Sequence, residues 1–271
     1  MKKFKAGNVI SHIYLIILTL ISIFPLVWII ISSLKGKGEL TGNPTAFWPE
    51  TWNFDYYAHV INDLKFFVNI RNSVIISLVT TLIAITVAAL AAYGIVRFFK
   101  RLGSAMSKVL VTTYIFPPIL LAIPYSVVMG KLGLINTRIG LVIVYLSFSV
   151  PYAVWLLTGF FRTVPLEIEE AARIDGANGF RTVWDIILPL IRRSMMFVFV
   201  SNTVANLLMF VPMYMITLGG PEMSTNLMMY EAYKSGFIYA DFGRSYAIVT
   251  LILLVSFAVV MVEMKVLKPK H

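Results

Sequence analysis

EAARIDGANGFRTVWDIILP, residues 170–189, is part of a charged stretch between two long apolar ones. Charged residues of both signs recur between positions 162 and 193, whereas the flanking windows 139–161 and 194–221 contain none. Each window is about as long as a helix that crosses the hydrocarbon of a bilayer, where charged side chains are costly. The sequence therefore predicts a membrane protein in which residues 162–193 form a loop in water.

The loop is predicted to contain two helices separated by a glycine. Pro165 suits a first helical turn because it lacks an amide hydrogen, and the positive end of the helix dipole favours the carboxylates that follow it. A helix over 165–175 would end at Gly176, because glycine adopts the left-handed backbone conformation without a Cβ penalty. Asn178 then caps a second helix.

Side chains of the two helices have separate predicted roles. Glu169 and Arg173 are spaced i, i+4 in the order that favours an ion pair within the helix, which leaves Glu170 for an outside partner. Ala171 and Ala172 leave room for another protein to approach closely. An apolar stripe on the second helix is predicted to lie along the membrane surface or a partner, and it contains Phe180, Val183, Trp184 and Ile187.

The segment resembles the cytoplasmic coupling loop of the membrane subunits of binding-protein-dependent ATP-binding cassette (ABC) importers. The shared pattern is Glu-Ala-Ala, three residues, Gly176, nine residues, then Ile186-x-Leu188-Pro189, and every position is filled. The resemblance implies that the first short helix docks in a cleft of a separate ATP-hydrolysing subunit. The residues implied in this contact are Glu170 for a charge pair, Ala171, Ala172 and Gly176 for a close fit, Asp175 for local order, and Pro189 at the end of the motif.

The composition places the rest of the chain in a bilayer. Hydrophobic residues make up 59% of the 271 residues and charged residues 13%, which leaves too little polar surface for a soluble domain of this size. We predict an all-α membrane protein with six transmembrane helices in a single permease domain, residues 1–271. A first helix and an outer loop occupy 1–70, and five core helices occupy 71–262. The six uncharged windows are 6–34, 72–96, 109–130, 139–161, 194–221 and 245–262.

The positions of Lys and Arg predict the orientation. With the amino terminus inside the cell, the inner segments hold 15 of the 23 basic residues, as the positive-inside rule expects. The formal charge of +10 is thus a topology signal, and no nucleic-acid partner is predicted. Both termini are expected on the cytoplasmic side of a bacterial inner membrane. The apolar run after Lys2, Lys3 and Lys5 is too long for a signal-peptide core and is predicted to be retained.

Two further stretches resemble the smaller permease subunit of maltose-type sugar importers. One covers residues 23–35, at the end of the first helix. The other contains Gly219, Gly220 and Pro221 and resembles the last outer loop of sugar-type permeases. In that family the loop reaches the external binding protein, and these three residues would supply the sharp turn.

Three features are candidates for the substrate path. The helix over 139–161 aligns aromatic and small side chains on one face, where rings and hydroxyls suit a sugar, although such a face also serves ordinary packing. Two asparagines one turn apart in the fifth window either bridge helices or face the path, because an unpaired amide is costly in hydrocarbon. Prolines break the third helix, which then lies beside the path or forms a packed kink. The residues are Tyr145, Ser149, Tyr152, Trp155 and Gly159; Asn202 and Asn206; and Pro117, Pro118 and Pro124.

The residues that the chain lacks argue against several functions. No charged side chain lies in the six windows, whereas ion-coupled carriers and channels usually need intramembrane charges. No glycine-rich loop ends in Gly-Lys-Ser/Thr, so ATP and its Mg²⁺ are expected on another chain. The chain has no cysteine, and His12, His59 and His271 have no spacing that suggests a metal site. We therefore predict no enzyme activity and no cofactor bound by this chain.

The function predicted from these residues and the resemblance is that of the smaller permease subunit of an ABC importer for a sugar or oligosaccharide. Its expected partners are a second, related permease, two ATPase subunits and an external solute-binding protein. An importer for another small neutral or zwitterionic solute would use the same loop. A secondary carrier that works without ATP and a scaffold protein are the alternatives from other classes.

Overall fold

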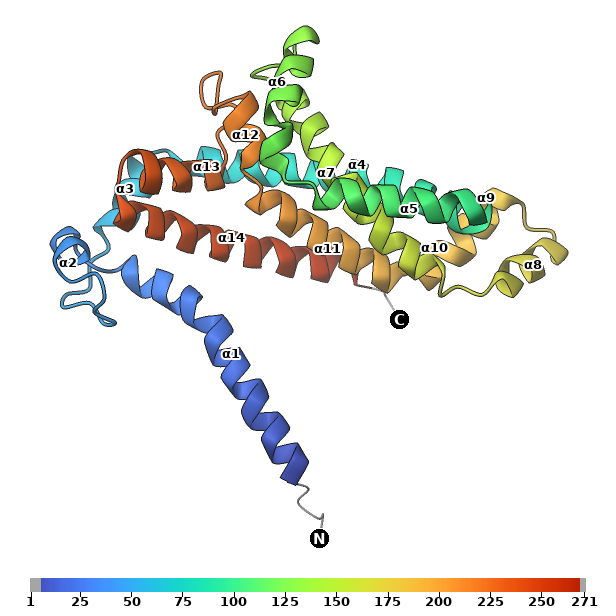
Figure 1. Ribbon diagram of the computed structural model, residues 1–271, viewed down its shortest axis with the longest axis horizontal. Coiled ribbons are helices and arrows are strands. Elements are labelled where there is room, and N and C mark those ends of the chain that lie inside the picture. Colours follow the sequence, from blue (N-terminus) through green and yellow to red (C-terminus); the bar gives the residue numbers. More distant parts are fainter. Residues whose placement is uncertain (1–5, 269–271) are drawn as a thin grey trace. The chain divides into compact units, whose positions relative to one another are not determined.

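The protein is described over residues 6–268 by a computed structural model, and each regular element in that range is a helix (Figure 1). The chain divides into two compact units. The first unit contains the residues up to Phe67 together with Glu231–Leu254, and the second contains Val68–Tyr230 together with the residues from Val255 onward. The terminal residues 1–5 and 269–271, to which the predicted cytoplasmic termini and His271 belong, lie outside the described residues.

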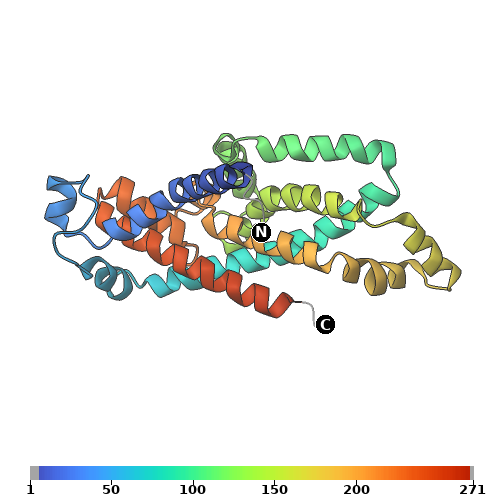
Figure 2. The ribbon, with the colours of Figure 1, turned by 90° about the horizontal axis from the view of Figure 1, so that it is seen from below.

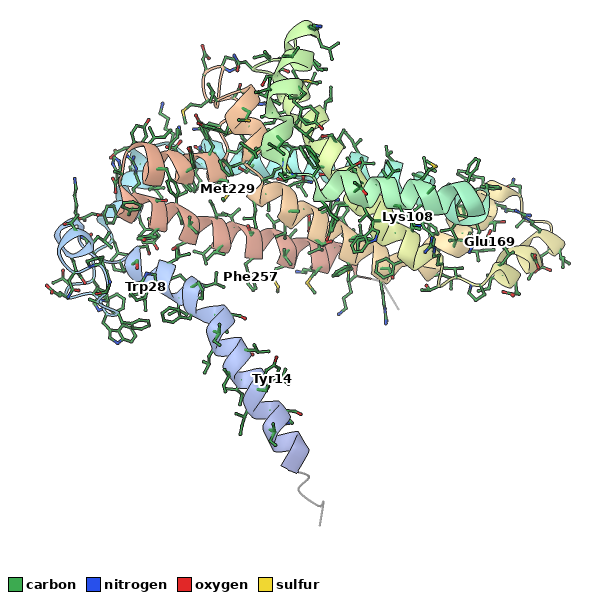
Figure 3. All side chains as sticks on the ribbon, viewed as in Figure 1. Tyr14, Trp28, Lys108, Glu169, Met229 and Phe257 are labelled. Atoms are coloured by element: carbon green, nitrogen blue, oxygen red, sulfur yellow. The ribbon has the colours of Figure 1, made fainter. Side chains whose placement is uncertain are left out.

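The first unit contains the first long helix, several short helices and part of the last helix. Most of α1 is exposed and extends away from the rest of its unit (Figure 1). Lys35, just beyond α1, is fully buried, donates a hydrogen bond to the carbonyl of Ala46 and lies 5.2 Å from the ring centre of Trp28, which Figure 3 labels. The elements are α1 (Ala6–Ser32), α2 (Lys37–Gly42), α3 (Asp55–Asn62), the π-helical η3 (Lys234–Ile238) and the first part of α14 (Phe242–Leu267).

The second unit is a helical bundle in which α7 packs against α5 and α11. Its long helices are α4 (Phe66–Arg97), α5 (Lys100–Ile115), α7 (Arg138–Phe161) and α11 (Arg192–Leu208). The shorter elements are the 3₁₀-helix η1 (Pro118–Leu121), α6 (Ala122–Lys131), α8 (Leu166–Ile174), α9 (Gly179–Arg181), the π-helical η2 (Thr182–Ile187), α10 (Leu188–Leu190), α12 (Val211–Ile216) and α13 (Met228–Tyr233).

Four helices in the described residues are long and apolar enough to cross a membrane: α1, α4, α7 and α14. The predicted third and fifth windows are also helical, but each contains a break. In 109–130 the chain leaves α5 at Phe116, because Pro117 and Pro118 cannot continue its hydrogen bonds. In 194–221 α11 ends at Leu208 and α12 begins at Val211. The all-α membrane fold is therefore confirmed, with two of the six predicted spans made of shorter pieces.

Small residues on α4 allow the neighbouring helices to pack closely. Ala88 and Ala92 of α4 join a core with α7, η2 and α11 that includes Leu157, Phe161 and Ile187. Without a hydrophobic force between helices in lipid, close backbone approach is a main source of helix association. The buried small residues along this helix face are Ser73, Ser77, Thr81, Ala84 and Ala88.

Candidate functional site

The predicted loop lies at one end of the second unit. Both views show α8 beyond the ends of α7 and α11 (Figures 1 and 2). The helix spans Leu166–Ile174, and Glu167 and Glu169 lie in its first turn, where the helix dipole favours carboxylates. The loop thus presents a short helix outside the apolar bundle.

The helix–glycine–helix arrangement is confirmed by its hydrogen bonds. Gly176 has a φ of +87°, and its amide donates to the carbonyl of Arg173 at 3.1 Å. A Cβ built on Gly176 would meet nothing within 4 Å, so the backbone conformation and not space selects glycine. The side chain of Asn178 accepts a bond from the amide of Arg181 at 2.9 Å and caps the second helix.

Glu169 ties α8 to the transmembrane helix α4. Its carboxylate, 1% exposed, accepts bonds from Arg97 Nε and, at 3.1 Å, from the hydroxyl of Tyr93. Arg97 also donates from Nη2 to the carbonyl of Val164 at 2.8 Å. The predicted ion pair between Glu169 and Arg173 is therefore wrong, because the carboxylate turns inward to a cation on another helix. Figure 3 labels Glu169 at this end of the bundle.

The outward face of α8 carries most of the residues expected to meet a partner. Glu170, Ala171 and Asp175 are exposed, and Gly176 is exposed beside them. Ala172 lies on the opposite face and is buried within the chain. Pro189 is exposed on α10, at the far end of the loop. Five of the residues predicted to meet the partner therefore lie between Glu170 and Gly176. Four of these five are exposed, and Ala172 is not.

The predicted apolar stripe of the second helix is divided between two environments. Ile187 is fully buried in the bundle core, whereas the rings of Phe180 and Trp184 are exposed and stack with centres 6.0 Å apart. The π-helical turns of η2 contain more residues per turn than an α-helix, so the α-helical spacing used in the prediction does not hold. The two stacked rings form an exposed aromatic patch on the loop.

Asn202 and Asn206 bridge helices, which is one of the two alternatives that the sequence left open. Asn206 donates to Thr81 on α4 at 3.1 Å and accepts from the hydroxyl of Ser149 on α7 at 2.7 Å. It also donates to the side-chain oxygen of Asn202 at 2.9 Å, and Asn202 donates to the backbone carbonyl of Ser149 at 3.2 Å. Both asparagines are 1% exposed, so the network joins α4, α7 and α11 inside the bundle.

Replacing Asn206 with leucine is expected to destabilise the bundle by about 2 kcal/mol, because the buried polar groups on α4 and α7 lose their shared partner. Thermal unfolding of the purified subunit measures the effect. Asn62→Leu, which makes the same change at an exposed position of α3, is the control and should be near neutral. Equal unfolding temperatures for the two variants would contradict a stabilising network.

The three aromatic candidates on α7 do not share one site. Tyr145 is fully buried, and its hydroxyl donates to the carbonyl of Met209 at 2.6 Å, just beyond the end of α11. Tyr152 is partly buried. Trp155 is half exposed and lines a cavity of about 500 Å³ together with Lys108, labelled in Figure 3, and Arg162. Trp155 is thus the aromatic candidate that faces open space.

The turn around Gly219 is formed as predicted. Gly219 has a φ of +85°, Gly220 donates its amide to the carbonyl of Thr217 at 2.8 Å, and the Gly220–Pro221 peptide is cis. The hydroxyl of Thr225 donates to the carbonyl of Gly220 at 2.6 Å. Within this tightly bonded turn Pro221 is exposed, so its ring is open to a partner.

Sequence reasoning missed two ionisable groups: Arg97, which is partly buried, and Glu263, which is buried. Arg97 carried no signal of its pairing, because its partner is 72 residues away in the chain. Glu263 lies just past the predicted sixth window, but α14 continues to Leu267, so the carboxylate is inside the helix and is buried beside Thr203. The signal available in the sequence was that Glu263 directly follows the uncharged window 245–262.

Comparison with known proteins identifies relatives of this chain. The chain is 33% identical over 193 residues to the diacetylchitobiose uptake system permease protein NgcG of Streptomyces coelicolor, and 32% identical over 183 residues to the inner membrane ABC transporter permease protein YcjP of Escherichia coli. The matches cover 71% and 67% of this chain. They span 64% and 65% of the relatives, so the chain covers less than two thirds of the length of these proteins.

Solved structures show the same fold. A chain in the crystal structure of a bacterial ABC transporter that imports the acidic polysaccharide alginate superimposes with a TM-score of 0.70 and 20% identity, covering 98% of this chain and 99% of that one. The family model for the inner membrane component of binding-protein-dependent transport systems matches residues 84–270, which include the whole loop. The chain is a multi-pass membrane protein that belongs to the family of binding-protein-dependent transport system inner membrane components.

Proposed function

We propose that the chain is a permease subunit of an ATP-driven importer for a sugar or oligosaccharide. The observation that carries the proposal is the construction of α8: a short helix with one exposed face, which ends at Gly176 and is tied to a transmembrane helix by the ion pair Glu169–Arg97. Such a connection can pass a displacement at the loop into the bundle. Membership of the family and the resemblance of the loop motif support this role.

The proposed partners follow from what this chain provides. A separate ATPase subunit would receive α8 in a cleft, with Glu170 in a charge pair and Ala171 and Gly176 in close contact. A second permease would complete the membrane part, and an external solute-binding protein would deliver the cargo near Gly219, Gly220 and Pro221. ATP and Mg²⁺ would be bound by the ATPase subunits, so this chain would have no catalytic residues of its own.

The proposed mechanism is alternating access. Closure of the ATPase subunits would move α8, and the Glu169–Arg97 connection would transmit the movement to α4 and the bundle. Ligands shift such an equilibrium only through different affinities for the two states, so the loaded binding protein must favour the outward-open state. The loop and both termini would lie in the cytoplasm, as the distribution of Lys and Arg predicts.

The proposal of a sugar as cargo has two supports. NgcG and other similar proteins are named for carbohydrate uptake, including the trehalose/maltose transport system permease protein MalG of Thermococcus litoralis. In this chain, the cavity at Trp155 combines an indole ring with hydroxyl groups of Thr112 and Thr158, which suits the apolar faces and polar edges of a sugar. The other path candidates would reach the cargo when the bundle opens in another state of the transport cycle. They are Tyr145, Tyr152, Asn202 and Asn206.

Reconstitution in liposomes tests the function. The chain is combined with a second permease, the ATPase subunits and a binding protein, and uptake of labelled oligosaccharide is measured with and without internal ATP. The proposal expects uptake only with ATP and the binding protein. Uptake by the chain alone, driven by an ion gradient, would instead establish a secondary carrier; ATP-driven uptake of neutral amino acids but not sugars would establish a different cargo.

A further inference from the structure

A cavity of about 450 Å³ lies at the junction between the loop and α11 in the second unit. Most of its wall is apolar, and the side chains that matter for its chemistry are Trp184, Arg192, Met195, Met196 and Phe199. Among the described residues that line it, Arg192 is the charged one. The cavity therefore combines one cation with a largely apolar space.

The lining residues of α11 are ordered by polarity along the helix. Arg192, Met195, Met196 and Phe199 are spaced i, i+3, i+4 and i+7, so they share one face of the helix. Arg192 is the first residue of α11, and Phe199 lies about 10 Å further along the axis. The cation thus stands at the end of the helix next to the loop, and the apolar side chains run from it into the bundle.

The surroundings of Arg192 favour an anion. Its side chain is exposed, and the described residues offer it no ion pair. The indole of Trp184, which is 62% exposed on the neighbouring loop, has an N–H donor and an apolar body of the kind that gathers at membrane interfaces.

We propose that this cavity binds one anionic phospholipid of the cytoplasmic leaflet. The phosphate lies at Arg192, and an acyl chain lies along Met195, Met196 and Phe199. The apolar track of about 10 Å fits within one leaflet, whose hydrocarbon is about 15 Å thick. The inference rests on the cytoplasmic orientation proposed above for the loop.

An anionic lipid explains the arrangement better than a zwitterionic one or a water-soluble partner. A zwitterionic headgroup would place its own cation near Arg192, and a soluble anion would leave the apolar track unused. Methionine side chains are flexible and accommodate a chain of variable shape. Because Trp184 and Pro189 of the loop line the same cavity as α11, the bound lipid would brace the second half of the loop against the bundle.

The test uses the assembled transporter in mixed lipids and a variant in which Trp184 is the single tryptophan, the others being replaced by phenylalanine. Brominated phosphatidylglycerol should quench Trp184 at about one fifth of the mole fraction that brominated phosphatidylcholine requires, since one cation near the membrane surface contributes about a fivefold preference. Arg192→Gln should abolish the preference. Arg193→Gln, which removes the same charge from an exposed neighbour that does not line the cavity, should keep it.

A second measurement avoids the tryptophan replacements. Native mass spectrometry of the wild-type complex should show a retained phosphatidylglycerol that is lost from the Arg192→Gln complex and kept by the Arg193→Gln complex. Equal quenching by the two lipids, or equal loss from both variants, would overturn the proposal. Protection of Trp184 from both brominated lipids would show that a neighbouring protein chain fills the cavity. These results are independent of uptake, so a failure here leaves the ATP-driven transport reaction untouched.

Discussion

Replacing Glu169 with leucine is expected to reduce ATP-driven uptake to background and to lower the stability of the subunit. The carboxylate is 1% exposed and pairs with Arg97, which also holds the carbonyl of Val164. Removal of one member of a buried pair leaves the other charge without compensation and costs roughly 3–5 kcal/mol. The link from α8 to α4 would be lost together with this stability. Uptake in liposomes and thermal unfolding measure the two effects.

Glu167→Leu is the matched control, because Glu167 lies in the same first turn but is exposed. It should change stability by less than about 0.5 kcal/mol. The double variant Arg97→Leu/Glu169→Leu replaces both charges by apolar groups and should recover most of the stability, since paired apolar replacements of buried ion pairs are often neutral. Similar behaviour of Glu169→Leu and Glu167→Leu would remove the basis for the proposed connection.

Glu170→Lys should insert and fold as the wild type does but lose at least about 99% of uptake. The side chain is exposed, so its replacement leaves the bundle intact, whereas a reversed charge in a desolvated contact costs several kcal/mol. Gly176→Trp should also lose uptake while the subunit still inserts, because the indole would stand on the contact face and a φ of +87° strains the end of α8 for any residue with a Cβ. Copurification of the ATPase subunit with each variant measures the contact, and uptake measures coupling.

Glu167→Lys serves as the control for the charge reversal, since it makes the same change elsewhere on α8. It should retain most of the uptake. Transport at the wild-type rate by Glu170→Lys or by Gly176→Trp would show that this face of α8 does not couple ATP hydrolysis to movement of the bundle.

Features set by neighbouring residues were predictable from the sequence. The end of α8 at Gly176 and the cap at Asn178 each depend on backbone geometry within a few positions, and both are confirmed. The break at Pro117–Pro118 likewise follows from the missing amide hydrogens. Rules for helix ends and proline breaks were sufficient because the contacts involved lie within a few residues in the sequence.

Features set by distant contacts were not predictable. The i, i+4 spacing rule paired Glu169 with Arg173 on the same helix. A solvent-exposed pair of that kind stabilises a helix by only about 0.3–0.5 kcal/mol. The interaction of the Glu169 carboxylate with Arg97 and Tyr93 on α4 forms instead. The hydroxyl of Tyr145 meets the carbonyl of Met209, which is free because α11 ends there. Neither partner could be identified without the fold.

Site-specific crosslinking from α8 tests the coupling role most directly. The chain has no cysteine, so Ala171→Cys introduces a single thiol on the exposed face of α8, and Glu222→Cys introduces one on the exposed turn after Gly220. In intact cells that express the whole transporter, Ala171→Cys should crosslink to the ATPase subunit and resist a membrane-impermeant maleimide added outside, whereas Glu222→Cys should react with it. Labelling of Ala171→Cys from outside, with no crosslink to the ATPase subunit, would contradict the account.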